Sequence, residues 1–310
     1  MAPSVRSTIT HLAFTPAYTP GRVAALLTAP SLADAVGGQR VMVTGASSGI
    51  GRALAIKLAA AGARVILVAR SADALEELAG EIGATWHACD LSDPECVEVL
   101  VANVLAAYGG VDVLVNNAGR SIRRSVGESV ERPQDRERVM ALNYHGAVNL
   151  TLGLLGAMRE QGRGQIINVS TLGVIALPPR FSAYVASKAA LDAFARTLAQ
   201  ETRHSGVRVT TVHMPLVRTP MIAPTAAYDK AEALSPEQAA DMIVEAIRTR
   251  RPSVSPRAAW IMSAARAVAP APFETVMNRA YLASRPLTGA ATSPGRALAR
   301  RVGKVFSVRL

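Results

Sequence analysis

A tyrosine and a lysine stand four positions apart in the alanine-rich run SAYVASKAA, residues 182–190. Such a run favours a helix, and residues four apart on a helix share a face, so the Tyr184 phenol and the Lys188 ammonium are expected to be neighbours. A free phenol has a pKa of about 10, and lowering it by about three units takes about 4 kcal/mol. A positive charge about 4 Å away supplies about that much at an effective dielectric constant near 20. The pair can then exchange a proton with a bound molecule near neutral pH; in the alternative interpretation, Tyr184 packs on a sheet and Lys188 is a solvated helix residue.

A glycine-rich stretch, VTGASSGIGRALA (43–55), follows a short β-branched run and leads into a helical pattern. Its glycines allow a tight turn and a close backbone approach, and a helix N-terminus offers amide donors and a partial positive charge to a pyrophosphate. We interpret the stretch as a dinucleotide-binding loop, with an ordinary strand-to-helix turn as the alternative. The candidate cofactor-binding residues are Gly45, Ser47, Ser48, Gly49, Ile50 and Gly51.

Short β-branched runs alternate with helical stretches along the middle of the chain. Strands alternating with helices predict a parallel sheet covered on both faces, which is a doubly wound, Rossmann-like α/β fold of about seven strands. The helix expected over residues 236–250 begins with Ser235 as N-cap. The expected strands are residues 40–45, 63–69, 84–90, 111–119, 164–170, 206–214 and 252–256.

Composition shifts divide the chain into four parts. Residues 1–39 have little periodicity and are expected to be an N-terminal arm with one short helix around residues 22–27. Residues 40–256 form the expected dinucleotide-binding and catalytic domain, and residues 257–284 a C-terminal helical extension. A segment rich in Pro, Gly, Ser and Thr then leads into a basic tail, residues 285–310.

Four features together resemble the short-chain dehydrogenase/reductase family over roughly residues 38–255. They are the glycine spacing, NNAG at residues 116–119, Ser170 and the Tyr184-x-x-x-Lys188 pair. The resemblance implies that Ser170 binds the substrate carbonyl oxygen, Tyr184 donates a proton and Lys188 holds the nicotinamide ribose. It also implies that the cofactor supplies a hydride. Asn143, in ALNYHG, is similar to the family's helix asparagine that positions a water in the proton relay; polarity satisfied by a neighbouring residue is the alternative for Asn143.

The choice of cofactor depends on the end of the second expected strand. An NAD enzyme usually carries Asp or Glu there to bind the ribose 2′-hydroxyl, but this chain has Ala69 and Arg70. A guanidinium binds a 2′-phosphate through two parallel hydrogen bonds, so we expect NADP(H), with Arg70 as a plain surface residue in the alternative. By resemblance, the remaining cofactor contacts are Asp90 and Leu91 at the adenine, Asn117, Ala118 and Gly119 along the adenosine, Tyr184 and Lys188 at the ribose, and Thr219 at the nicotinamide amide.

The substrate is expected to be apolar. The stretch MIAPTAAYDKAEAL (221–234) follows the sixth strand and offers Met221, Ile222, Ala223 and Tyr228 as a lid. Met214-Pro215 replaces the family's usual Pro-Gly and leaves the local turn in doubt. The region from the sixth strand onward resembles bacterial fatty acyl-CoA and fatty aldehyde reductases. We therefore expect reduction of a fatty-acyl or fatty-aldehyde carbonyl to the alcohol; a 3-oxoacyl or steroid-like ketone/alcohol dehydrogenase and a catalytically silent NADPH-binding regulator stay open.

Other protein classes receive little support from the composition. Two cysteines without C-x-x-C spacing and five scattered histidines argue against a disulfide framework and a metal site. Without a secretory signal, a cytoplasmic location is the default expectation. Residues 139–158 carry no charge, yet their Asn, His and Gly content favours a helix buried against a sheet over a membrane span.

The formal net charge of +11 is concentrated at the C-terminal end, because residues 251–310 carry ten Arg or Lys against one Glu. Residues 295–310 have the pattern of a basic amphipathic helix, which predicts weak, salt-sensitive docking on an anionic membrane without a membrane span. A frayed, solubilising tail is the equal alternative. No aromatic residues interleave the arginines, so we expect no nucleic-acid binding.

A helical stripe predicts a core or dimer contact, with a lipid groove as the alternative, and we expect a homo-oligomer. The stripe consists of Phe273, Val276, Met277, Ala280 and Tyr281.

Overall fold

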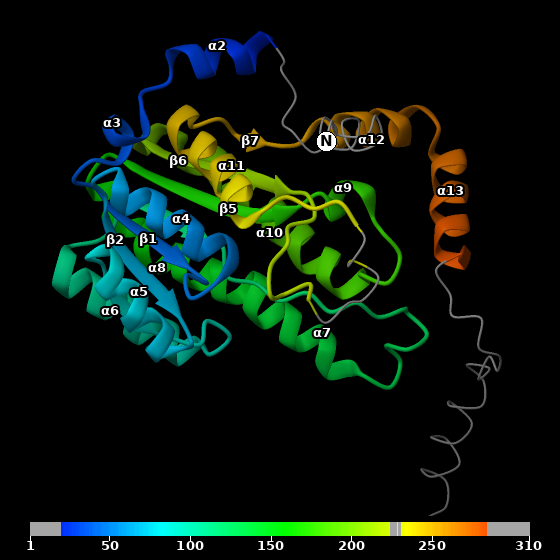
Figure 1. Cartoon of the computed structure of the whole chain (residues 1–310), viewed down its shortest axis with the longest axis horizontal. Coiled ribbons are helices and arrows are strands. Elements are labelled where there is room, and N and C mark those ends of the chain that lie inside the picture. The colour runs from blue at the N-terminus through cyan, green and yellow to red at the C-terminus, as the bar shows by residue number, and fades with distance from the viewer. Residues whose placement is uncertain (1–19, 224–227, 229–230, 284–310) are drawn as a thin grey trace, which may run out of the picture.

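A seven-stranded parallel sheet forms the centre of the molecule (Figure 1). The structure, a computed structural model, describes residues 20–223, 228 and 231–283. The strand order β3-β2-β1-β4-β5-β6-β7 confirms the predicted doubly wound α/β fold. The strands are β1 (Arg40–Thr44), β2 (Arg64–Ala69), β3 (Thr85–Ala88), β4 (Val113–Asn116), β5 (Gly164–Thr171), β6 (Val207–Met214) and β7 (Ser253–Val254).

Helices cover both faces of this sheet (Figure 1). Along the catalytic part of the chain they are α4 (Gly49–Ala60), α5 (Ala72–Ile82), α6 (Pro94–Tyr108), α7 (Pro133–Met140), the π-helical segment Ala141–Gly146, α8 (Ala147–Glu160), α9 (Gly173–Ala176), α10 (Ser182–Thr202), the 3₁₀ turn Arg203–Ser205 and α11 (Pro236–Thr249). The flanking helices are α2 (Pro20–Thr28), α3 (Leu32–Val36), α12 (Arg257–Val268) and α13 (Pro270–Ala283).

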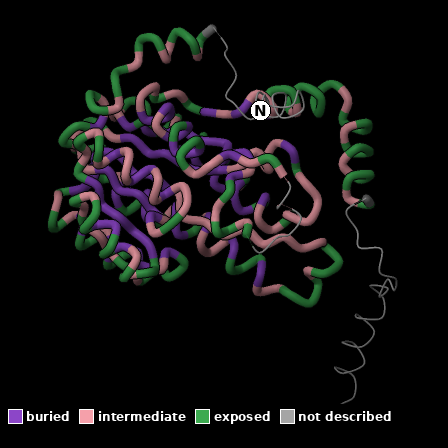
Figure 2. The backbone as a smooth tube through the Cα atoms, viewed as in Figure 1, coloured by how far each residue is buried: buried purple, intermediate pink, exposed green. Residues whose placement is uncertain are grey.

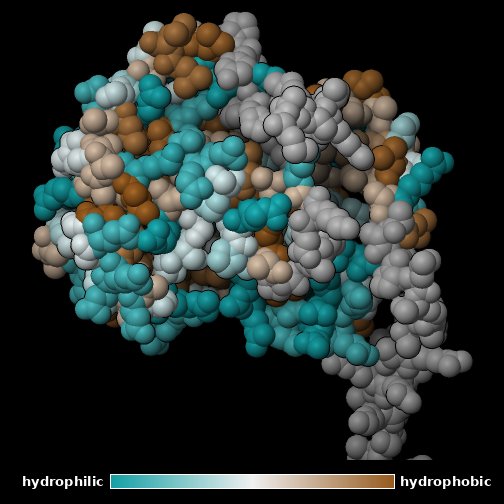
Figure 3. Space-filling view, viewed as in Figure 1, coloured by the Kyte–Doolittle hydropathy of each residue, from teal (hydrophilic) through white to brown (hydrophobic). Residues whose placement is uncertain are grey.

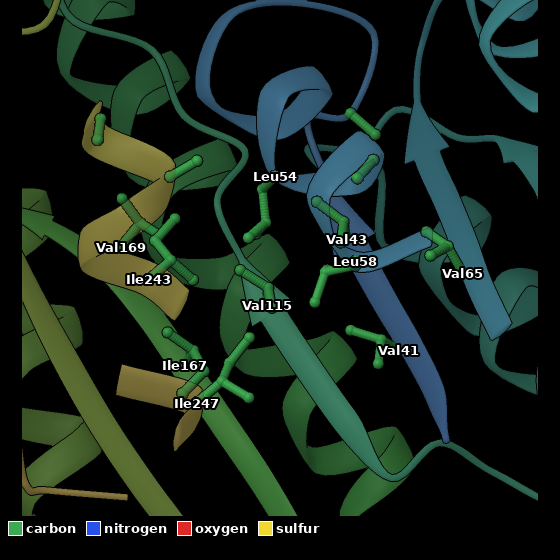
Figure 4. Packing of buried hydrophobic residues seen from close by; sticks show 14 of the residues in the cluster. Val41, Val43, Leu54, Leu58, Val65, Val115, Ile167, Val169, Ile243 and Ile247 are labelled. Carbon is green, nitrogen blue, oxygen red and sulfur yellow. The ribbon is translucent and has the colours of Figure 1, made fainter. Parts of the chain in front are cut away.

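The buried apolar residues form two clusters, one on each face of the sheet. On one face, Leu54 and Leu58 of α4 and Ile243 and Ile247 of α11 pack on alternate residues of β1, β2, β4 and β5 such as Val43 (Figure 4). On the other face, α6, α8 and α10 cover the side chains that point the opposite way along the same strands. Figure 2 shows the consequence: the central strands are mostly buried, whereas the edge strand β3 is not, and the outer helices have one buried side.

The strand order reverses between β1 and β4. From β1 the chain proceeds outward to β2 and β3, and from β4 it proceeds outward to β5, β6 and β7. In open parallel sheets the crevice at the carboxyl ends beside such a reversal is where ligands bind. The loops after β1, β4, β5 and β6 therefore carry the candidate site.

Local signals in the sequence set several of these elements. Ser235 accepts a hydrogen bond from the Gln238 amide at 3.2 Å, and the Gln238 side chain accepts one from the Ser235 amide at 2.9 Å, so α11 begins at the predicted N-cap. The uncharged segment 139–158 is a helical stretch with one face buried against the sheet, as expected, and the π-helical turn lies inside it. No helix among the described residues combines the length and apolarity that crossing a bilayer requires.

The flanking helices lie outside the sheet layers. Arg22 of α2 pairs with Glu245 of α11 at 2.6 Å, which fastens the end of the arm to the domain. In α13, Val276 is 62% exposed, so the predicted stripe is not part of the core of this chain. Figure 3 shows apolar side chains at the surface over α2, α12 and α13. The predicted basic tail, residues 285–310, lies outside the described residues.

Candidate active site

The loop after β1 is shaped for a bound diphosphate. Gly45 has φ +66°, and a Cβ atom there would lie 2.9 Å from Ala118 Cα. At Gly51 a Cβ atom would lie 2.2 Å from the Gly45 carbonyl oxygen, so only glycine fits at either position. Ser48, the N-cap of α4, makes no capping hydrogen bond with its side chain, which leaves the first amides of α4 facing the loop. These amides and the missing side chains fit a dinucleotide pyrophosphate.

Hydrogen bonds between β1 and β4 hold this loop in place. The Thr44 hydroxyl oxygen accepts from the Asn117 and Ala118 amides, each at 3.0 Å. The Asn117 side chain donates to the Thr44 carbonyl at 2.9 Å. These hydrogen bonds hold the ends of β1 and β4 together, and Asn117 lines the cavity next to them.

A cavity of about 780 Å³ runs from the glycine loop past β5 to the loop after β6. Ser170, at the end of β5, lines it and is 2% exposed. Its hydroxyl oxygen is buried and has no hydrogen-bond partner among the described residues. Tyr184 and Lys188 of α10 line the same cavity, so the predicted serine, tyrosine and lysine meet there. An unpaired buried hydroxyl is unfavourable unless a ligand completes it, so its position indicates a binding point for a polar atom.

The electrostatics of the tyrosine differ from the sequence-based expectation. Burial raises the pKa of Tyr184, and the opposing influence is a hydrogen bond with the Thr171 side chain, not the charge of Lys188. Lys188 is 4% exposed and donates from Nζ to the Val169 carbonyl at 2.8 Å. Burial lowers the pKa of Lys188 to about 8, against the charge of Asp192, which raises it. The expectation that the Lys188 charge lowers the Tyr184 pKa is therefore not met, because burial raises that pKa and Lys188 is not among the groups that act on it.

Asn143 lies behind the cavity and does not line it. It is fully buried in the π-helical segment, where its side-chain oxygen accepts from the Arg120 amide at 2.7 Å. Its Nδ2 atom donates to the Arg120 carbonyl at 2.9 Å and to the Ser187 hydroxyl at 3.0 Å. Asn143 thus ties the loop after β4 to α10, as the alternative of neighbour-satisfied polarity predicted.

The second predicted cofactor region lies at the end of β2. Arg70 lines the large cavity and also a smaller one of about 230 Å³. Asp90 lines only the smaller cavity. Hydrogen bonds from the Ser92 amide and hydroxyl, at 3.0 and 2.6 Å, hold the Asp90 pKa below its usual value, with further help from the charges of Arg70 and Arg120. Asp90 therefore shapes the turn after β3, and its carboxylate is ionised near two arginines.

The far end of the cavity is mostly apolar. The segment after β6 returns to the sheet through a parallel bridge between Val217 and Leu234, and the Leu234 amide donates to the Leu216 carbonyl at 2.9 Å. Three of the four predicted lid residues, Met221, Ile222 and Tyr228, line the cavity, whereas Ala223 does not; the remaining lid residues 224–227 and 229–230 lie outside the described part.

Most predicted site residues meet in one cavity. Besides the lid residue Ala223, the exceptions are Gly51, which packs on the backbone of Gly45, and Asp90 and Asn143. Met214-Pro215 forms part of the wall, so the turn exists without the family's usual Pro-Gly. Sequence patterns did not point to the apolar lining residues that lie around α9 and at the start of α10. These are Leu172, Ala176, Pro178, Phe181 and Val185.

A family model described as short chain dehydrogenase matches residues 39–230, which is more than half of the chain. The chain therefore belongs to the short-chain dehydrogenase family, and it is an oxidoreductase of the kind that uses a nicotinamide dinucleotide and a small-molecule substrate.

Two curated relatives have about half of their aligned residues in common with this chain. An uncharacterized oxidoreductase of Mycobacterium tuberculosis is 51% identical over 259 residues, covering 81% of this chain and 76% of the relative. A fatty acyl-CoA reductase of Acinetobacter baylyi is 50% identical over 240 residues, covering 76% of this chain and 81% of that protein.

Solved structures have the same fold. A short-chain dehydrogenase from Streptomyces avermitilis has a TM-score of 0.69 at 31% identity, covering 81% of this chain and all of that one. A metagenomic short-chain oxidoreductase in complex with NADP has a TM-score of 0.59 at 34% identity, covering 70% and 94%. A 3-ketoacyl-(acyl-carrier-protein) reductase of Brucella melitensis complexed with NADH has a TM-score of 0.64 at 28% identity, covering 72% and 93%.

Proposed function

We propose that this protein is an NADP(H)-dependent reductase that converts the carbonyl of an apolar fatty-aldehyde substrate into the alcohol with one hydride and one proton; a fatty-acyl thioester would take two hydrides in succession, the first releasing the thiol and the aldehyde. The observation that carries the proposal is the buried Ser170 hydroxyl, which has no partner among the described residues and lies in one cavity with Tyr184 and Lys188. A hydroxyl donor, a phenol and an ammonium lining one cavity form a site that can bind a carbonyl oxygen and protonate it.

Each of the three side chains has a defined task in this proposal. The Ser170 hydroxyl donates a hydrogen bond to the carbonyl oxygen and holds it against the sheet end. The Tyr184 phenol gives its proton to that oxygen as negative charge develops there. Lys188 keeps a positive charge beside the phenol and holds the ribose. When bound, the cofactor supplies the hydride.

The residues at the end of β2 favour NADP(H) within the nicotinamide cofactors. Arg70 lines the cavity at the place where an NAD enzyme usually has a carboxylate, and no acid stands next to it in the strand. A guanidinium pairs with a 2′-phosphate through charge-assisted hydrogen bonds, whereas a carboxylate would repel it. The glycine loop and the uncapped start of α4 would hold the pyrophosphate.

The apolar end of the cavity supports a substrate with a hydrocarbon chain. Its wall is built by Leu172, Phe181, Leu216, Met221 and Ile222. The volume is that of a large ligand pocket, so it can accept a chain in addition to the cofactor's nicotinamide. The similarity to a fatty acyl-CoA reductase supports the same substrate class.

Delivery of such a substrate from a membrane surface is part of this proposal. The basic residues of the tail lie outside the described part, but α12 and α13 directly precede it and expose Trp260, Ile261 and Val276 at 60, 67 and 62%. Apolar side chains followed by basic ones are what docking on an anionic bilayer requires.

A substrate screen tests the proposed function. Oxidation of NADPH and of NADH is followed with long-chain aldehydes, acyl-CoA, 3-oxoacyl thioesters and short polar aldehydes of matched concentration. We expect turnover with NADPH and a chain-bearing carbonyl, with kcat/KM rising as the chain lengthens. Faster turnover of short polar carbonyls would contradict the apolar substrate, and faster turnover with NADH would contradict the cofactor.

A further inference from the structure

A buried set of three polar residues lies behind the cavity wall. His213 of β6 is 2.9 Å from Asp192 of α10 through its Nε2 atom and 2.8 Å from the Ser255 hydroxyl through its Nδ1 atom. Asp192 and His213 are only 3 and 7% exposed, and Ser255, just after β7, is half-buried. None of the three lines the cavity, so they do not touch a ligand there.

The set is connected to the site through α10. Asp192 follows Lys188 by one helical turn, so both side chains lie on the buried face of the same helix. Among the described residues, Asp192 is the acid whose charge acts on the buried Lys188 ammonium. The Oδ1 atom of Asp192 has no hydrogen-bond partner among these residues, so its only hydrogen bond comes from His213.

The hydrogen-bond distances fit an ionised Asp192 beside a neutral His213 ring. A negative Asp192 needs a donor, and His213 supplies it when Nε2 carries the proton. The Nδ1 atom of that neutral ring then accepts a hydrogen bond from the Ser255 hydroxyl. This tautomer leaves one net negative charge, held at a fixed place one turn behind Lys188.

We propose that Asp192, held by His213 and Ser255, is a positioning residue that keeps Lys188 an ammonium in the working enzyme. Burial alone would favour a neutral lysine, and a neutral amine holds a ribose hydroxyl and supports the phenol more weakly. The inference rests on the proposed function for the role of Lys188, but not on the identity of the substrate.

Among the groups around Lys188, Asp192 is the one whose charge a substitution should remove to test the proposal. On α10 the neighbouring titratable group is the Tyr184 phenol, whose pKa is already raised by burial and which is neutral over the range in question. From β6, His213 faces Asp192. The other elements present neutral groups, namely the Val169 carbonyl and Ser170 hydroxyl of β5, Asn143 of the π-helical segment and the Gly119 backbone.

The experiment measures the dissociation constant of NADPH against pH by fluorescence, with Asp192→Asn and wild-type protein. In the wild type, affinity falls as the pH rises through the Lys188 pKa of about 8. Asn retains an oxygen that accepts a hydrogen bond from His213 but carries no charge, so the Lys188 pKa falls. The alkaline limb, meaning the fall of NADPH affinity at high pH, then moves to lower pH by about 0.5 to 1 unit. At the wild-type midpoint the variant then binds about three-fold more weakly.

Controls separate this role from a structural one. Asp112→Asn removes a second buried carboxylate, paired with Arg40 at 2.9 Å and distant from the cavity lining, and should lower stability without moving the limb. If Asp192→Asn does not fold, Asp192→Leu with His213→Phe exchanges the pair for apolar side chains, which is often tolerated, and should move the limb in the same direction.

The outcomes are distinguishable. A limb that stays in place in the charge-removing variant would overturn the inference and leave the proposed function standing. A wild-type affinity with no alkaline limb would overturn both the inference and the role assigned to Lys188.

Discussion

Replacing Ser170 with alanine should lower activity without lowering stability. The Ser170 hydroxyl is buried and unpaired among the described residues, so the folded protein gains nothing from it. An unsatisfied buried hydroxyl costs about 1 to 3 kcal/mol, and part of this is recovered when the oxygen is removed. We expect the free energy of unfolding of Ser170→Ala to be unchanged or up to about 1 kcal/mol higher, which is about 2 °C in Tm for a domain of this size.

The same hydroxyl has a large effect in the transition state of the proposed reaction. Loss of one donor to a developing oxyanion lowers kcat by about 100-fold to 1000-fold, or about 2.7 to 4 kcal/mol. The assay compares kcat with a long-chain aldehyde and Tm by calorimetry for both proteins. Turnover within ten-fold of wild type would refute the role of Ser170 at the carbonyl.

A matched control is present on the neighbouring strand. Thr210 of β6 is fully buried, its hydroxyl also has no partner among the described residues, and it does not line the cavity. Thr210→Val should leave the protein at least as stable and fully active. If Thr210→Val gains stability while Ser170→Ala loses more than about 1 kcal/mol, the Ser170 hydroxyl has a partner in the folded protein and the reasoning fails.

Four further predictions concern other parts of the site. Tyr184→Phe should lower turnover by at least about 100-fold with NADPH affinity nearly unchanged, and near-normal turnover would contradict its role as proton donor. Arg70→Ala should raise KM for NADPH by at least about ten-fold and KM for NADH far less, because one charge-assisted pair contributes about 1.5 to 3 kcal/mol; equal effects would make Arg70 a surface residue. Gly51→Ala should abolish NADPH binding in a titration, because its Cβ would lie 2.2 Å from the Gly45 oxygen, and wild-type affinity would show that the loop adapts. Removal of residues 291–310 should abolish salt-sensitive sedimentation with anionic liposomes, and identical sedimentation of both chains would exclude the tail as an anchor.

The fold was predictable because its signals are local. Alternation of β-branched runs with helical stretches predicted the strands to within a few residues, and Ser235 marked the start of α11. The short helix α3 was missed because its five residues are too few to show a period, although the Ser31 side chain caps it by accepting from the Asp34 amide at 3.1 Å.

The glycine loop and Ser170 were expected to meet because both lie at the carboxyl ends of parallel strands, which share one edge of the sheet. Tyr184 was expected there because α10 is the helix that comes next after β5 and its following loop. The environment of each side chain was not predictable. Whether a charge or burial dominates at Tyr184 depends on packing that no spacing encodes, and the same applies to Asn143, whose partners come from residues 120 and 187. The Asp192–His213 hydrogen bond joins α10 to β6, which are far apart in the sequence, so neither residue stood out there.

Transfer of deuterium tests the central claim most directly. Wild-type protein is given NADPH deuterated at the transferable position together with a long-chain aldehyde, and the alcohol is analysed by mass spectrometry. The proposed function predicts that the alcohol formed carries one deuterium at the former carbonyl carbon, and that Ser170→Ala and Tyr184→Phe form it much more slowly. An alcohol without deuterium, or no alcohol from any chain-bearing carbonyl, would contradict hydride transfer at this site.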